Sequence, residues 1–341
     1  MISINARILG KRVTGVQRYL TEILSRLTVE HRLLAPATNR QGFTGHLWEQ
    51  LILPSLAGNS LLWSPSQSGP MWRNQQVLTV HDLAPLEFAR YLSPAFARWY
   101  AVMMPSVIRS ARRIIAVSDF TADRLRKVLS VPLEKISVVH EAVDHSKFRP
   151  SSAADIESAL LRYQAPSRAY VLSVCTLERR KNLARLLEAW SAIQDRVASE
   201  TWLLLSGSFG DRHVFGTTEV TLPPRVRTLG YVADADLPHL YSGCRAFAYV
   251  SEYEGFGLPV LEAMASGAPV LTSAGTSTEE IAKGAAVLAD PRSVDDIARK
   301  LHELITEPSL RQEKMQAGLE VAKTYSWNRA ARETEAILRS S

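Results

Sequence analysis

Residues 245–270 read RAFAYVSEYEGFGLPVLEAMASGAPV and carry the clearest structural signal in the chain. A short apolar strand, 246–250, leads into a loop with two glycines, and a helix then begins near Pro259, a residue well tolerated in a first helical turn. Gly255 and Gly257 let the backbone approach a ligand closely, and the N–H groups that begin the helix make an anion site. The stretch therefore predicts a strand–loop–helix unit with a ligand site in its loop.

Short apolar or β-branched runs alternate with helical patterns along the chain. Apolar residues share one helix face at Val16, Tyr19, Leu20, Ile23, Leu24 and Leu27, and again at Leu183, Leu186, Leu187, Trp190 and Ile193. The predicted strands are 31–35, 61–64, 76–80, 113–117, 136–139, 169–174, 202–206, 226–229, 246–250, 269–272 and 286–288. This alternation occurs twice, which indicates two α/β domains, each a parallel sheet covered by helices on both faces.

A polar stretch at 149–168, RPSSAADIESALLRYQAPSR, separates the two patterns. It contains two prolines and precedes a new buried strand. We therefore predict a first domain of residues 1–150 and a second domain of residues 151–325. The length of 341 residues also fits two domains.

The composition is that of a soluble globular protein, with 46% hydrophobic and 22% charged residues. Two cysteines exclude a disulfide scaffold, and no apolar run approaches the roughly 18 residues of a membrane span. The N-terminus lacks the apolar core of a secretory signal. We expect a cytoplasmic protein.

The net charge of +6 is unevenly distributed. Residues 1–150 carry 19 Lys and Arg against 10 Asp and Glu, a net charge of +9, whereas residues 151–341 carry 21 against 24, a net charge of −3. A basic half joined to a slightly acidic half indicates an anionic partner for the first half. No recognition motif supports a nucleic-acid partner.

Two carboxylates, Glu254 and Glu262, flank the glycine loop with seven residues between them. Glu254 could be an ordinary carboxylate at a helix start, and Glu262 could be a solvated helix position. The apolar neighbours of Glu262 argue against a fully wet face. The residues alone leave these alternatives open.

This E-x7-E arrangement resembles the donor-site motif of glycosyltransferase family 4, the retaining enzymes of the GT-B fold. The resemblance extends over nearly the whole chain. The other matching segments are TGVQRYLTEIL, LTVHDLAPLEF and RIIAVSDFTADRL in the first half, and LSVCTLERRKNLARLLEAW, LLLSGSFG, LGYVADADLPHLYSGC and SAGTSTEEIAKGAAVLADP in the second. It implies two Rossmann-like domains facing across a cleft, with the C-terminal helix, 326–341, crossing back to the first domain.

The resemblance assigns roles in the donor domain. Glu254 would face the donor sugar and Glu262 would hold the ribose, while Lys181 and Arg180 would bind the diphosphate and stabilise the charge that develops on it. Further donor contacts would come from the backbone of Phe256, Gly257 and Leu258, from Gly207, and from Tyr231 and Val232 near the base. Gly207 could equally be a plain turn glycine.

In the first half, RVTGVQRYL places Gly15 in a loop between the first strand and a helix. In the family this loop approaches the diphosphate or the acceptor. His81 follows the strand QVLTV, and by resemblance it would line the pocket near the reacting carbon, although a capping or core-satisfied histidine is an alternative. Ser118 is predicted to cap a helix that begins at Asp119.

Two departures from the family pattern stand out. Many relatives carry an arginine after a glycine where this chain has Cys175-Thr176, so Arg179 or Arg180 would supply that charge. In TSTEEIA, Glu279 stands where relatives often have proline, before Glu280.

The segment 93–127 mixes aromatic and apolar residues with seven basic ones. That mixture suits an anionic membrane surface, although a core-packed helix with a wet arginine face is the alternative.

The resemblance thus implies a metal-independent, retaining hexosyltransferase. It would use a nucleotide diphosphate sugar, with GDP-mannose the first choice and no further cofactor, and a glycan or lipid-linked acceptor of bacterial surface polysaccharide. Peripheral contact with the membrane is a further expectation. The alternatives are a GT-B enzyme of another class, such as a sugar-nucleotide epimerase or a phosphorylase, and a non-catalytic partner protein of the same fold.

Overall fold

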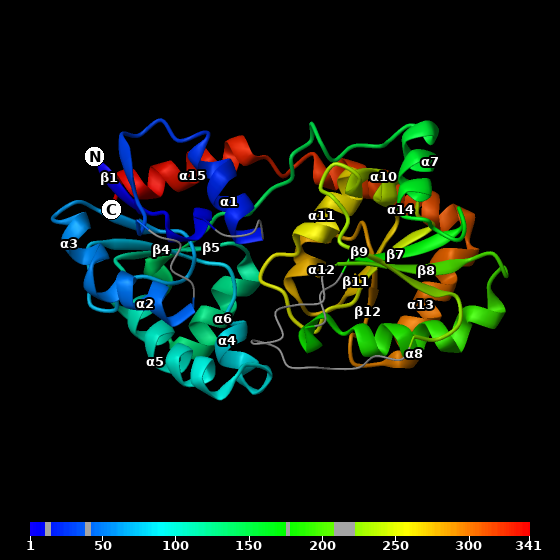
Figure 1. Ribbon diagram of the computed structural model, residues 1–341, viewed down its shortest axis with the longest axis horizontal. Coiled ribbons are helices and arrows are strands. Elements are labelled where there is room, and N and C mark those ends of the chain that lie inside the picture. The colour runs from blue at the N-terminus through cyan, green and yellow to red at the C-terminus, as the bar shows by residue number, and fades with distance from the viewer. Residues whose placement is uncertain (11–14, 38–41, 175–177, 208–221) are drawn as a thin grey trace. The chain divides into compact units, whose positions relative to one another are not determined.

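The computed structural model describes residues 1–10, 15–37, 42–174, 178–207 and 222–341, and it divides into two compact α/β units (Figure 1). Unit 1 comprises residues 1–90, 94–142 and 326–341, and unit 2 comprises residues 91–93 and 143–325. The main transition between them falls after Ala142, whereas the sequence placed it after residue 150.

Unit 1 is built on a six-stranded parallel sheet in the order β2-β1-β3-β4-β5-β6. Its strands are β1 (Ile2–Asn5), β2 (His31–Leu34), β3 (Leu62–Ser64), β4 (Gln76–Val80), β5 (Arg113–Ala116) and β6 (Ile136–Val138). Its helices are α1 (Gly15–Leu24), α2 (Gly42–Leu51), α3 (Leu53–Ala57), α4 (Ala84–Glu87), α5 (Pro94–Ser110), α6 (Asp119–Leu129) and α15 (Trp327–Arg339), with short 3-10 turns η1 (Arg7–Gly10), η2 (Ala89–Tyr91) and η3 (Leu133–Lys135). Ser118 caps α6 through a hydrogen bond from the Thr121 N–H, as predicted.

The strand β1 has no range among the predicted strands, although Gly15 was expected to follow a first strand. It has only four residues, two of them the polar Ser3 and Asn5, yet all four are buried because β1 pairs with β2 on one side and β3 on the other. Its position inside the sheet, rather than its residues, makes it a strand.

Unit 2 repeats the plan, with the parallel order β12-β11-β10-β7-β8-β9. Its strands are β7 (Tyr170–Val174), β8 (Trp202–Ser206), β9 (Val226–Gly230), β10 (Ala246–Tyr249), β11 (Val270–Ser273) and β12 (Val287–Ala289). Its helices are α7 (Ala153–Arg162), α8 (Leu183–Ile193), α10 (Leu237–Gly243), α11 (Leu258–Ala265), α12 (Ser277–Ala282), α13 (Val294–Thr306) and α14 (Pro308–Ala322), with 3-10 turns η4 (Arg179–Lys181) and η5 (Gln194–Arg196).

Helix α8 packs its predicted apolar face into the core of unit 2 against α13 and the sheet. The polar stretch 149–168 is not simply a break, because α7 forms within it. Ser152 caps that helix, and Ala159 and Leu160 are its buried residues. The stretch is mostly polar in sequence because α7 buries only a narrow side of its surface.

The C-terminal helix α15 belongs to unit 1, where it packs against α1 (Figure 1). The rings of Tyr19 and Trp327 lie 6.2 Å apart, and Glu335 accepts hydrogen bonds of 2.7 Å from both the backbone and the hydroxyl of Thr28. The expected return of the C-terminal helix to the first domain is therefore confirmed.

Candidate active site

The strands of unit 2 are all parallel, so the loops that follow them lie along one edge of the sheet. The adjacency of β7 and β10 at the centre of this sheet brings the loop after β7 beside the loop after β10. These two loops carry Arg180 and Lys181 on one side and Glu254 on the other. Glu254 thereby contacts Lys181 and Arg180, which precede it in the sequence by 73 and 74 residues.

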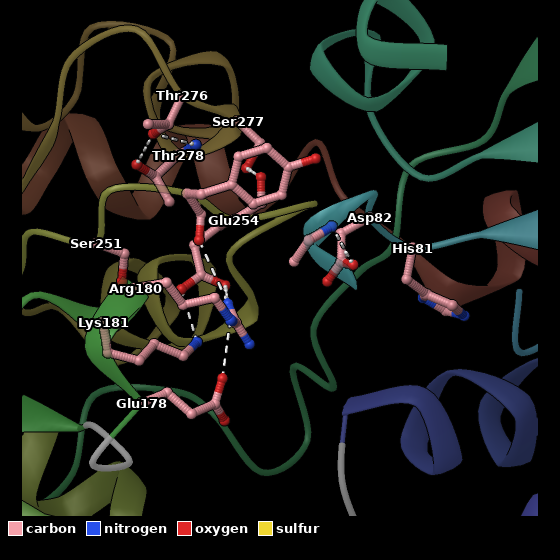
Figure 2. Close-up of polar contacts among 12 residues, drawn as sticks. His81, Asp82, Glu178, Arg180, Lys181, Ser251, Glu254, Thr276, Ser277 and Thr278 are labelled. Atoms are coloured by element: carbon pink, nitrogen blue, oxygen red, sulfur yellow. Dashed lines mark hydrogen bonds and ion pairs between the residues drawn. The ribbon is translucent and has the colours of Figure 1, made fainter. Parts of the chain in front are cut away.

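Glu254 is the centre of a buried charge cluster (Figure 2). Its Oε1 accepts hydrogen bonds from Lys181 Nζ at 2.6 Å and from the Tyr249 hydroxyl at 3.0 Å, and its Oε2 accepts from Arg180 Nη1 at 3.3 Å. Arg180 also pairs through Nε with Glu178 at 2.8 Å. The structure thus brings together the three side chains assigned to the donor sugar and the diphosphate.

The cluster perturbs the protonation of its members. Burial by itself would raise the pKa of the Glu254 carboxyl, but the charges of Lys181 and Arg180 outweigh burial and lower it to about 2. Burial, together with the negative charge of Glu254, raises the pKa of the Tyr249 hydroxyl. At neutral pH the cluster therefore holds an ionised carboxylate between two cations.

The surrounding backbone holds Glu254 in place. The Ser277 hydroxyl donates to the Glu254 carbonyl at 2.8 Å, which ties the loop to the start of α12. Gly257 begins α11 with a φ of 107°, and a Cβ there would lie 2.7 Å from the Thr278 methyl carbon, so only glycine fits. Pro259 has no N–H, and the N–H groups of Val260 and Leu261 donate to the Gly257 carbonyl at 2.9 and 3.4 Å. The Leu258 N–H at the helix start is therefore the donor of α11 that suits an anion.

Asn182 shapes the opposite loop. It adopts a φ of 60°, and its side-chain amide donates to the carbonyls of Val250 at 2.9 Å and Pro291 at 2.6 Å. This residue ends η4 and begins α8, so it sets the direction from which Lys181 approaches Glu254. The sequence analysis did not select Asn182, although an asparagine directly before a helical pattern is a detectable signal.

The other predicted donor residues lie on neighbouring loops. Glu262 is buried on α11, which excludes the solvated alternative, and it accepts a hydrogen bond from the Tyr241 hydroxyl at 3.5 Å. Gly207 ends β8 with a φ of 147° and donates its N–H to the Gly230 carbonyl at 2.9 Å. After β9, Tyr231 is exposed and Val232 is buried, while Phe256 and Leu258 are both buried beside Gly257. Cys175 and Thr176, where the chain departs from the family pattern, lie outside the described residues.

His81 lies in unit 1, directly after β4, and it is buried. Its Nδ1 lies 2.8 Å from Glu141 Oε1 and its Nε2 lies 2.8 Å from the Pro65 carbonyl oxygen. A carboxylate and a backbone carbonyl both accept hydrogen bonds, so these two contacts favour an imidazole that donates from both nitrogens. Burial alone would lower the pKa of His81, but the hydrogen bond and charge of Glu141 outweigh burial and raise it.

One expectation for unit 1 is wrong, and one alternative given for it is confirmed. Gly15 is the first residue of α1 rather than a loop residue; residues 11–14 lie outside the described residues. In the segment 93–127 the apolar side chains Met103, Met104, Val107 and Ile108 belong to the core, because α5 packs its apolar side against β4 and β5. The core-packed alternative is thus correct for these positions.

The chain matches two family models. Residues 54–147 match the model for Glycosyltransferase Family 4, and residues 163–320 match that for Glycosyl transferases group 1. O-antigen chain mannosyltransferase B of Escherichia coli is 34% identical over 261 residues, which cover 76% of this chain and 68% of that protein. The chain is a family 4 glycosyltransferase.

Two further comparisons concern length and fold. The serotype-specific mannosyltransferase WbdA of Escherichia coli is 28% identical to this glycosyltransferase over 284 residues, which cover 78% of the chain but only 33% of WbdA. The crystal structure of WaaG, a glycosyltransferase involved in lipopolysaccharide biosynthesis, superposes with a TM-score of 0.76 at 15% identity, covering all of both chains. The fold is therefore GT-B, as the resemblance implied.

In this glycosyltransferase, four residues near Glu254 and His81 were not predicted as site residues from the sequence. Tyr249 and Ser277 contact Glu254, Asn182 positions Lys181, and Glu141 pairs with His81. Tyr249 lies in an apolar strand and Glu141 follows one. Neither position signals a partner that is distant in sequence.

Proposed function

We propose that this glycosyltransferase moves a hexose, with mannose from GDP-mannose the first choice, from a nucleotide diphosphate sugar to a hydroxyl group. The acceptor is a glycan or a lipid-linked glycan in the synthesis of a bacterial surface polysaccharide. The names of the mannosyltransferase relatives support the choice of sugar and pathway. The observation that carries the proposal is the buried contact of Lys181 and Arg180 with Glu254 at the start of α11.

The cluster suits cleavage of a sugar–diphosphate bond. Lys181 and Arg180 neutralise the diphosphate, which gains negative charge as the glycosidic bond breaks, and the Leu258 N–H at the start of α11 donates to it. Glu254 accepts hydrogen bonds from the sugar hydroxyls and so orients the reacting carbon. Glu262, buried on the same helix, accepts from the ribose hydroxyls, and Tyr231 with Val232 lies near the base.

The proposed route to retention is front-face attack, which needs a base for the acceptor proton on the face from which the leaving group departs. Both ring nitrogens of His81 are already engaged by protein groups, Glu141 and the Pro65 carbonyl, so neither is placed to accept that proton. The departing phosphate oxygen accepts it while the acceptor oxygen bonds to the anomeric carbon. In this scheme His81 contributes positive charge and position, and no metal ion is needed.

The donor base is tested by thermal shift. The full chain is melted with GDP, UDP, ADP or dTDP at one shared concentration, so that the tightest ligand gives the largest shift, about 2.7 kcal/mol if that concentration is 100 times its dissociation constant. GDP is expected to give the largest shift. A larger shift with UDP would assign the other donor class.

The reaction is tested by incubating the enzyme with GDP-mannose and a mannose-terminated acceptor. Proton NMR of the product is expected to show the donor's anomeric configuration, and an inverted centre would refute the retaining scheme. Activity is expected to persist in EDTA. Loss in EDTA with rescue by a divalent cation would refute metal independence.

We place this reaction at the cytoplasmic face of the membrane, because a lipid-linked acceptor is anchored there. Among the described residues, no helix combines the length and the apolar character needed to cross a bilayer. Peripheral contact through the basic unit 1 would then bring the enzyme to its acceptor.

A further inference from the structure

Helix α2 carries apolar side chains on two opposite sides. Trp48 is buried and packs with Leu53 in a small core cluster, whereas Phe43, Leu47 and Leu51 are 56%, 40% and 71% exposed. The spacing of four residues places these three along one side of the helix, opposite the buried side. The solvent side of a helix in a soluble domain is normally polar.

The exposed apolar surface continues beyond α2. Ile52, directly before α3, and Leu56, within α3, are both exposed. Trp72, in the loop after β3, is 82% exposed. The Gln50 side chain accepts a 2.9 Å hydrogen bond from the Met71 N–H, so this loop is fastened to the end of α2. We call these exposed side chains, on α2, at α3 and in the fastened loop, the apolar strip. Its members are Phe43, Leu47, Leu51, Ile52, Leu56 and Trp72.

The charged side chains that border the apolar strip are positive. Glu49 is the only acidic residue among residues 31–81, and it is fully buried in a polar network. Arg32 donates to the Leu56 carbonyl at 2.8 Å, and Arg73 donates to backbone carbonyls just after α3, so both cations border the strip. Because Glu49 is buried, no carboxylate of residues 31–81 is exposed to repel an anionic surface.

The segment 93–127, whose mixture of apolar and basic residues suits a membrane, lacks such a surface. Of its large apolar residues, only Val102 on α5 is highly exposed. Arg124 and Lys127 on α6 are paired with Glu87 and Asp123. The surface that combines apolar exposure with uncompensated positive charge lies on α2 and α3 instead.

We propose that the apolar strip docks on an anionic phospholipid bilayer, a proposal that rests on the proposed use of a lipid-linked acceptor. The leucines and Phe43 enter the boundary between headgroups and acyl chains, where Trp72 keeps its indole N–H in contact with water. Arg32 and Arg73 lie against the lipid phosphates. A bilayer fits better than a protein, because the strip presents hardly any polar groups for directional recognition.

The test is co-sedimentation of the full chain with vesicles of phosphatidylcholine alone or with 30% phosphatidylglycerol. The wild type is expected to bind the anionic vesicles and to be released by high salt. Trp72→Ala and the double variant Leu47→Ser/Leu51→Ser are each expected to bind at least tenfold more weakly. Val102→Ser, at an exposed apolar position of α5 outside the strip, is the matched control and is expected to bind as the wild type does.

Three outcomes would overturn the proposal: undiminished binding by the strip variants, equal loss in Val102→Ser, or a wild-type dimer in solution that Leu51→Ser dissociates while vesicles are not bound. Nucleotide thermal shifts and transfer to a short water-soluble acceptor are measured on the same samples. The strip variants are expected to match the wild type in both. Failure of both in the wild type would contradict the proposed function without bearing on vesicle binding.

Discussion

Replacement of Glu254 by glutamine tests the charge cluster most directly. The substitution keeps the size of the side chain but removes the negative charge that lies 2.6 Å from Lys181 Nζ and 3.3 Å from Arg180 Nη1. In the structure these two cations form ion pairs with Glu254, whereas in the proposed reaction they bind the diphosphate. The carboxylate and the diphosphate therefore compete for the same charges.

The size of that competition follows from the pKa. A carboxyl pKa of about 2 in place of 4.5 corresponds to about 3 kcal/mol of attraction between the carboxylate and its surroundings, at about 1.4 kcal/mol for each tenfold change. Glu254→Gln is expected to bind nucleoside diphosphate about tenfold more tightly than the wild type. The whole 3 kcal/mol would give roughly a hundredfold gain, but the cations retain part of their contact with the amide. Turnover is expected to fall by at least a hundredfold, because the sugar loses its charged acceptor.

The assay is calorimetric titration of nucleoside diphosphate, together with initial rates of sugar transfer. Glu252→Gln is the matched control. Glu252 lies on the same loop but pairs with Arg185, so its loss is expected to leave nucleotide affinity unchanged. Weaker nucleotide binding by Glu254→Gln, or unchanged turnover, would refute the reasoning.

The same carboxyl also links stability to pH. Its pKa is depressed in the folded protein, so its contribution is fully present above about pH 4.5 and is lost as the pH falls toward 2. In urea unfolding at pH 7, Glu254→Gln is expected to be less stable than the wild type by up to about 3 kcal/mol. The difference is expected to shrink with acidification, and a difference that stayed constant down to pH 3 would contradict the pKa.

Three further predictions concern single side chains. Glu141→Gln is expected to lower the pKa of His81, which imidazole ¹⁵N shifts followed through a pH titration detect; an unchanged titration midpoint would argue against Glu141 as the cause. Gly257→Ala is expected to destabilise the protein by about 1–3 kcal/mol in chemical denaturation, because its φ of 107° and the 2.7 Å approach to Thr278 exclude a Cβ. Lys181→Ala is expected to weaken nucleoside diphosphate binding by about 1.5–3 kcal/mol in calorimetry, since it removes a charge-assisted hydrogen bond; unaltered affinity would exclude Lys181 from the diphosphate site.

Much of the fold could be predicted from local pattern. Buried parallel strands such as YVLSV at 170–174 form apolar runs, and α8 displays its core face as a 3.6-residue period. Strand β1 escaped prediction because Ser3 and Asn5 interrupt its apolar pattern, and α7 escaped because only a narrow side of it is apolar. In both elements, burial against neighbours outweighs the local signal.

The sequence by itself determined the residue types of the site and the family to which they belong. Only the tertiary structure decided which of them meet. Glu254 contacts Lys181 because β7 lies beside β10, and His81 gains a charge partner because Glu141 follows β6 at the same edge of its sheet as β4. The +9 charge of the first half likewise gave no location for a membrane surface. Packing buried Met103, Met104, Val107 and Ile108 of α5 in the core. It left Phe43, Leu47 and Leu51 of α2 exposed, because a helix buries only the side that faces the core.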